Sequence, residues 1–235
     1  MRHFLLISTL IALLAPSTLS AQTVVIPKAG LLVAGETEGT FDCSASGRAD
    51  CGDLGGDEDL DDDSGVGFGL DLLFHTGENM RMGLGVFYTP STEYEDGKIQ
   101  GIKLEKLGSD ATINGILEFR VAKGHAADVF VRVEGGAAIL IPGDDLEDLE
   151  DMLDDSCPDG TDCDLSSGPY LGWNAGVGIG AAFHVGSDLR LRADLVYRRT
   201  DITGTTWDIE GPGGSLETKI TSVSDRTWMT LGVEF

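Results

Sequence analysis

The sequence predicts an all-β chain that forms an eight-stranded antiparallel up-and-down transmembrane β-barrel with long outer loops. Three observations support this fold class. Apolar residues alternate with small or charged ones along eight segments, which is typical of strands with two unlike faces. The connections between the segments alternate between short and long, as in barrels of bacterial outer membranes. The chain also opens with a segment typical of exported proteins.

That opening segment predicts a signal peptide over residues 1–21 and a single outer-membrane β-barrel domain over residues 22–235. Met1-Arg2-His3 precede an apolar run that ends at Leu14, and small residues follow as far as Ala21. The run is shorter than the ~20 apolar residues that a membrane-spanning helix needs. We therefore expect cleavage near Ala21 rather than a retained anchor.

The eight predicted strands share one pattern, in which every second residue is apolar. They cover residues 29–35, 66–74, 80–88, 113–121, 129–139, 171–183, 189–197 and 229–235. The intervening positions hold glycines and charges of both signs, namely Arg81, Glu118, Arg120, Arg132, Glu134, Arg190, Arg192 and Asp194. Because isolated charges are costly to bury and paired ones less so, this second face suits a narrow, filled lumen.

The predicted connections differ in length and composition. Short ones fall near residues 75–79, 122–127 and 185–188, and long ones near 42–64, 90–110, 142–168 and 198–222. Asp96-Gly97 and the Gly-Pro-Gly-Gly segment at 211–214 are turn signals. We expect two strand pairs to continue past the membrane as hairpins that end at these turns.

Aromatic residues indicate how the barrel is oriented. In the apolar register, four phenylalanines lie near the ends of the even-numbered strands: Phe74, Phe119, Phe183 and Phe235. Aromatic belts of this kind mark membrane interfaces. They predict a girdle at the periplasmic interface, with the N-terminus and the C-terminus both periplasmic.

The final strand resembles a known family. Trp228-Met-Thr-Leu-Gly-Val-Glu-Phe235 looks like the closing strand of bacterial outer-membrane proteins, which ends in a phenylalanine that the assembly machinery reads. With eight strands and long loops, the chain resembles small OmpA/OmpX-like barrels. This resemblance implies a bacterial outer-membrane location, with membrane lipid and the assembly machinery as partners. The peptidoglycan-binding domain of OmpA itself is not expected, since the chain stops at Phe235.

Acidic residues dominate the composition, and the net charge is −24. Nucleic acid is not an expected partner, because binding it needs a basic surface. Residues 42–64 and 142–167 are especially acidic, and they also hold the cysteines. Cys43, Cys51, Cys157 and Cys163 do not have zinc-site spacing, so in an exported chain they predict disulfides. Three connectivities are open, of which the local pairing of Cys43 with Cys51 and Cys157 with Cys163 is the simplest.

Carboxylates in these loops raise the question of a metal. The candidate ligands for a weak divalent cation, with Ca²⁺ as the possible cofactor, are Asp57, Asp59, Asp61, Asp63, Asp155, Asp159, Asp162 and Asp164. The EF-hand pattern fails, however, because Cys157 and Ser166 occupy ligand positions. A solvated acidic surface without any cofactor is the simpler interpretation. Leu146, Leu149 and Leu153 could form the apolar face of a short helix or belong to a disordered loop.

No enzyme signature was found. His184 lacks the His-x-Ser spacing of lipid A deacylases, and His75 and His125 fall at the predicted periplasmic turns. The sequence therefore favours a non-enzymatic outer-membrane barrel whose acidic, disulfide-bearing extracellular loops serve surface interaction or envelope stabilisation, with an extracellular ligand or surface as a possible partner. The alternatives are a narrow ion or small-solute channel and a soluble, lipocalin-like periplasmic binding barrel.

Overall fold

The structure is a computed structural model that describes residues 23–46, 56–90, 92–95, 98–99, 102–103, 108–143, 162–164, 169–186, 189–211 and 214–235. The expected signal peptide and the leucines near residues 146–153 lie outside these ranges. Over the same ranges, no helix has both the length and the apolar character to cross a membrane.

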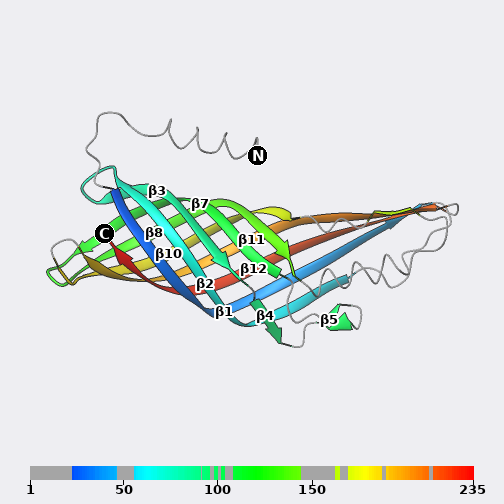
Figure 1. Cartoon of the computed structure of the whole chain (residues 1–235), viewed down its shortest axis with the longest axis horizontal. Coiled ribbons are helices and arrows are strands. Elements are labelled where there is room, and N and C mark those ends of the chain that lie inside the picture. The colour runs from blue at the N-terminus through cyan, green and yellow to red at the C-terminus, as the bar shows by residue number, and fades with distance from the viewer. Residues whose placement is uncertain are drawn as a thin grey trace.

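A closed antiparallel barrel of eight strands forms the body of the described chain (Figure 1). Its strands are β1 (Thr23–Ala45), β2 (Gly56–His75), β3 (Met80–Thr89), β7 (Gly108–Lys123), β8 (Ala127–Pro142), β10 (Tyr170–His184), β11 (Arg190–Gly211) and β12 (Gly214–Glu234). Each strand pairs with its neighbours in chain order, and β1 pairs with both β2 and β12, which closes the ring. The predicted fold class is confirmed.

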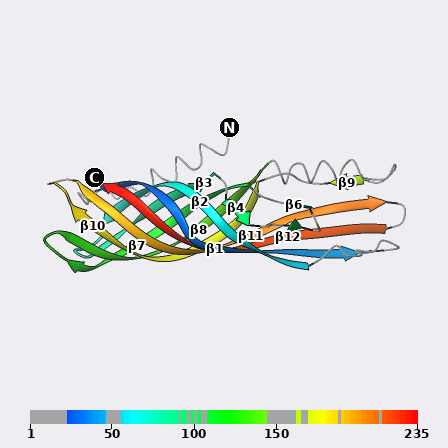
Figure 2. The same ribbon diagram turned by 90° about the horizontal axis from the view of Figure 1, so that it is seen from below.

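The barrel continues at one end as a long sheet. Figure 2 shows β11 and β12 extending well past the barrel as a hairpin, with β1 beside them. The hairpin turns between Gly211 and Gly214, where the turn was predicted. A short strand, β9 (Asp162–Asp164), pairs with the far end of β11.

Two expectations about the connections were wrong. Much of the expected loop at 42–64 is strand, because Glu36–Phe41 of β1 form an antiparallel ladder with Gly56–Asp61 of β2. The expected turn at Asp96-Gly97 lies outside the described residues, but the described strands beside it are not the two arms of a hairpin. The strand before it, β4 (Thr92–Glu95), pairs with β2, and β5 (Lys98–Ile99) pairs only with β6 (Ile102–Lys103) among the described residues. Backbone pairing therefore extends into polar sequence that lacks the apolar alternation.

The two faces of the wall have opposite polarity. Outward positions carry exposed apolar side chains, such as Leu195 and Ile179, while the inward positions between them hold the buried Asp194 and Arg192. A water-soluble domain places its apolar side chains inside. An apolar exterior around a polar interior is the arrangement of a barrel that spans a membrane.

The seam between β1 and β2 contains an interruption. Leu31 pairs with Val66 and Glu36 with Asp61, but residues 32–35 and 62–65 between them are not paired with each other. The ladder from β1 to β12 has a bulge at the same level, between Leu32 and Ala34. Beyond the interruption the pairing resumes in the same register, so the two strands separate locally without slipping.

Candidate functional site in the barrel interior

The lumen holds a dense set of charged side chains. Inward positions follow from the two-residue period of each strand, so every strand contributes polar groups to the same narrow space. Among the described residues, six buried cations face six buried anions: Lys28, Arg81, Arg132, Arg192, Arg198 and Arg226, with Asp71, Glu118, Asp128, Glu134, Asp194 and Glu234. The buried charges therefore cancel, and the large negative charge of the chain arises elsewhere.

Arg132 of β8 is the centre of one cluster. Its guanidinium lies 2.5 Å from Asp71 and 2.6 Å from Glu134. Lys28 of β1 also contacts Asp71, at 2.9 Å, and Arg198 of β11 contacts Glu134, at 2.5 Å. Each carboxylate thus binds two cations, which offsets the cost of removing these charges from water. The cluster joins four strands across the lumen.

Arg192 of β11 is the centre of a second cluster. It contacts Glu118 of β7 directly and Asp194 at 2.9 Å. Arg81 of β3 donates two hydrogen bonds of 3.0 Å to Glu234 of β12. Arg132 lies 3.7 Å from Glu118, so this carboxylate connects the two clusters. The result is a continuous ion-paired plug.

Two inward phenylalanines contact cations of the plug. The Phe130 ring lies 4.7 Å from the Arg81 guanidinium and 5.3 Å from that of Arg192. The Phe87 ring lies 5.0 Å from the guanidinium of Arg198 and 5.8 Å from the Lys28 ammonium. Cations over aromatic faces are attracted by the ring quadrupole. Each ring therefore adds an attractive contact for two of the buried cations.

Phe87 also requires a glycine on β2. A Cβ built on Gly67 would lie 2.4 Å from the Phe87 ring, much closer than normal contact. We expect Gly67→Ala to lower the free energy of unfolding by about 1–3 kcal/mol through overpacking. Urea titration of the folded protein in lipid vesicles measures this change. Gly115→Ala is the matched control, since its Cβ would have 3.7 Å to the nearest described atom. Equal stability of both variants would contradict the argument.

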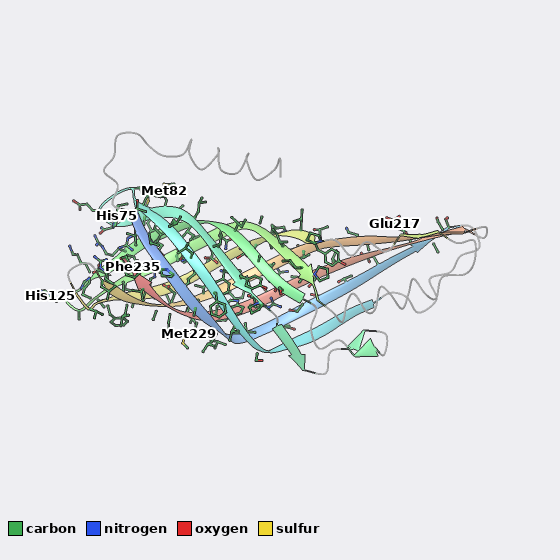
Figure 3. All side chains as sticks on the ribbon, viewed as in Figure 1. His75, Met82, His125, Glu217, Met229 and Phe235 are labelled. Carbon is green, nitrogen blue, oxygen red and sulfur yellow. The ribbon has the colours of Figure 1, made fainter. Side chains whose placement is uncertain are left out.

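A smaller polar group lies at the end of the barrel that holds the described termini. Asp128 is buried there, with Arg120 and Arg190 each at 3.7 Å and His184 at 3.6 Å. Figure 3 shows His75 and His125 at this end, with Phe235, and Glu217 at the opposite end. His75 accepts a hydrogen bond from Arg81 and so supports the plug. These histidines lie beside the turns, as predicted.

Towards the extended sheet, the lumen above the plug is polar but less charged. A cavity of about 20 Å³ lies there, lined by Phe87, Thr89, Asp110, Thr112, Ala138, Arg198, Thr200, Arg226 and Trp228. This volume accommodates about one water molecule. The amide oxygens of Asn114 and Asn174 are buried without a hydrogen-bond partner in the structure. Both residues pair with Gly136, so their amides flank one point on the wall.

The four predicted girdle residues lie together at one end. Phe74, Phe119, Phe183 and Phe235 are all exposed. Phe74 pairs with Thr23 at the start of β1, and the Phe235 amide bonds to Val25. Phe119 and Phe183 pair with Met80 and Ala127, which begin the strands after short turns. Their role as a membrane girdle stays a prediction.

The predicted metal and disulfide residues fall at the other end, at the border of what the structure describes. Asp57, Asp59, Asp61 and Asp63 belong to β2, and Asp162 and Asp164 belong to β9, but their side chains lie outside the described set, as do Asp155 and Asp159 entirely. The side chains that are described contain no group of three potential metal ligands. The metal site therefore stays a prediction.

The cysteines stay predictions as well. Cys51 and Cys157 lie outside the described residues. The backbone places Cys43 on β1 and Cys163 on β9, but their side chains lie outside the described set. All three connectivities therefore stay open.

Several members of the plug were not singled out by sequence reasoning. Lys28, Asp71, Arg198 and Glu234 complete the clusters. The same alternation could have found them, because Lys28 shares its register with Gly30, and Glu234 with Thr230 and Gly232. The pattern could not predict which charged side chains pair with one another, because partners such as Asp71 and Arg132 are 61 residues apart in the sequence.

No protein-family model matches the chain, and no curated protein matches it. Among solved structures, it is similar to outer membrane protein OprG from Pseudomonas aeruginosa, with 13% identity, a TM-score of 0.49, and coverage of 91% of this chain and 95% of OprG. It is also similar to AlkL, with 15% identity, a TM-score of 0.40 and 93% of each chain covered. Neisserial surface protein A shows 12% identity, a TM-score of 0.37, and coverage of 86% and 95%.

These TM-scores are below 0.5, so the classification depends on the strand pairing and on the two faces of the wall. The closed eight-stranded ring, apolar outside and ion-paired inside, defines a membrane-spanning β-barrel. Its architecture is that of the small, OmpA/OmpX-like outer-membrane barrels.

Proposed function

We propose that this protein is a non-enzymatic barrel of the bacterial outer membrane whose acidic outer segments serve surface interaction or envelope stabilisation. In this proposal the barrel is an anchor, both termini are periplasmic, and the extended β11–β12 hairpin presents its polar surface outside the cell. The observation that carries it is the pairing of an apolar exterior with a lumen filled by neutralised charges.

The charge plug supports an anchoring role over a transport role. Its ion pairs cross the lumen from β2 to β8 and from β7 to β11, so a solute would have to displace paired, buried groups. The soluble lipocalin-like alternative requires an apolar cavity inside the barrel. The interior described above is polar and charged, which does not support that alternative.

The acidic outer segments are the proposed interaction surface. The register places Asp61, Glu36 and Asp225 side by side on β2, β1 and β12. Asp225 is ion-paired with Arg199 at 2.9 Å, which leaves the acidic positions 36 and 61 directly opposite one another. Like charges in direct opposition destabilise a sheet. A hard cation bound by carboxylate oxygens would offset this repulsion, which supports the proposal of weak divalent-cation binding on the outer surface, in which calcium would link the chain to anionic groups nearby.

The proposal is tested first by heat-modifiability. Membrane fractions are run on a denaturing gel with and without boiling, and parallel samples are extracted with carbonate. We expect unheated protein to migrate as a compact species that shifts on boiling, and we expect it to stay with the membranes after carbonate. A soluble periplasmic protein without any shift would overturn the proposal.

The channel alternative predicts a different electrical behaviour. We expect the purified protein in planar bilayers to show no stepwise conductance, because paired side chains fill the lumen. A general porin inserted under the same conditions is the positive control. Reproducible single-channel steps from the folded protein would favour the channel and count against an anchoring role.

A further inference from the structure

The small cavity in the lumen lies between two buried arginines. Arg198 of β11 and Arg226 of β12 both line it, together with three threonines. The two arginines are direct cross-strand partners in the β11–β12 ladder, and both are buried on its inward face. Because like charges in direct opposition destabilise a sheet, negative charge close to this pair would stabilise it.

The carboxylates around this pair do not balance the positive charge there. The cluster around Arg132, extended by the ion pair of Arg226 with Asp110, contains four cations and three carboxylates among the described residues: Lys28, Arg132, Arg198 and Arg226, with Asp71, Glu134 and Asp110. Glu118 lies 3.7 Å from Arg132, but it binds Arg192 of the other cluster directly. Although the buried charges of the whole lumen cancel, this part of it therefore retains one positive charge.

Hydrogen-bond donors also converge on the cavity. Thr89 of β3, Thr112 of β7 and Thr200 of β11 each contribute a side chain to its lining. The Thr112 hydroxyl accepts a hydrogen bond of 3.5 Å from the Asn114 amide, so its own proton is available to a group in the cavity. Arg198 binds its carboxylate partner through Nε and Nη2, which leaves Nη1 outside that ion pair. Positive charge and donors thus surround a space the size of one water molecule.

We propose that the cavity binds one small monovalent anion of the halide class, with chloride as the natural occupant. The anion accepts hydrogen bonds from the guanidinium groups of Arg198 and Arg226 and from the Thr112 hydroxyl. The volume of about 20 Å³ admits a single ion similar in size to a water molecule and excludes phosphate, carboxylates and other polyatomic anions. Bound there, chloride offsets the repulsion between the opposed arginines and compensates the remaining positive charge.

The test compares the stability of the protein in two salts. The protein is folded into lipid vesicles in sodium chloride or in sodium gluconate of equal ionic strength, so that screening of charges is the same, and the urea midpoint is measured. Gluconate carries the same charge but is too large for the cavity. We expect the midpoint to rise with chloride concentration, as for a ligand that binds only the folded state, and not with gluconate. Equal midpoints in the two salts at every concentration would show that the cavity holds only water, which would overturn the proposal.

Matched threonine variants distinguish a bound ion from a general effect of the salt. Thr112→Val removes one donor without changing charge or shape, and we expect the chloride concentration for half of the effect to rise about tenfold. Thr230→Val is the control, because Thr230 is also buried and inward, lies outside the lining of the cavity, and has no hydrogen-bond partner for its hydroxyl in the described structure. We expect it to leave the chloride dependence unchanged. Equal chloride dependence of the two variants would contradict the assignment.

Bromide locates the ion directly, because it belongs to the same class as chloride and scatters X-rays anomalously. We expect crystals of the protein grown in sodium bromide to show an anomalous peak between Arg198 and Arg226, and an ordered lumen without that peak would reject the site. Each variant is first checked for the gel shift on boiling, which reports a folded barrel. Absence of that shift in the unmodified protein rejects the proposed function, whereas a normal shift with a chloride-independent midpoint rejects only the anion site.

Discussion

Replacing Arg132 with methionine is expected to lower the free energy of unfolding by about 3–5 kcal/mol, because one buried cation then no longer compensates several buried anions. Arg132 contacts Asp71, Glu134 and Glu118, and its side chain is 2% exposed. Methionine keeps much of the volume, so the loss reports charge rather than a cavity. The measurement is urea titration of the barrel in lipid vesicles, followed by gel mobility.

Two further variants make this result interpretable. Lys123→Met removes an exposed cation at the end of β7 and is expected to change stability by less than about 0.5 kcal/mol. Arg132→Met combined with Asp71→Asn should recover part of the loss, since the two residues share one interaction. A loss below about 1 kcal/mol in Arg132→Met would show that water reaches the lumen and that the plug is not dry.

The second large effect concerns the outer face. Ile179→Arg places a charge in the middle of the apolar wall, beside Val131 and Leu195. In a membrane this substitution is expected to cost about 2–4 kcal/mol, because arginine is most unfavourable near the bilayer midplane. Stability is measured in vesicles as before.

A matched position near the end of the barrel provides the depth control. Val185 follows β10 directly and is 59% exposed. We expect Val185→Arg to cost about 0–1 kcal/mol, since charges near the interface reach water. If both arginine variants were equally harmless, the outer wall would face water, and the membrane assignment of the fold would be wrong.

Much of the barrel was predictable from the sequence because membrane barrels impose a strict two-residue period. The runs around Leu117, Val133 and Leu195 alternate very regularly. The position of each strand, the face that each residue occupies and the order of neighbouring strands follow from this alternation. The extensions were not predictable in this way. Residues 36–41 and 56–61 are too polar to show the apolar alternation. Their position is fixed by pairing with one another and, for residues 36–41, by pairing with β12 as well.

The interior was predictable in kind but not in detail. Alternation places Arg132, Glu134 and Arg192 on the inner face, and the mixture of signs predicts pairing. The choice of partner for each carboxylate depends on the register of each strand relative to its neighbours. That register is a property of the closed barrel as a whole. A hollow on the outer wall, lined by Ala29, Leu31 and Phe68 among other apolar residues, also has no sequence signal, because it depends on the side chains that three strands place around one alanine.

The unpaired stretch between β1 and β2 has a mechanical consequence. A closed sheet distributes load around its whole circumference, so it yields first where the fewest hydrogen bonds resist. In the described backbone, residues 32–35 of β1 have a partner strand on the β12 side but not on the β2 side. Their amides should exchange with solvent deuterium sooner than those of the continuous β7–β8 ladder. The seam between β1 and β2 would then be the place where the barrel wall opens locally.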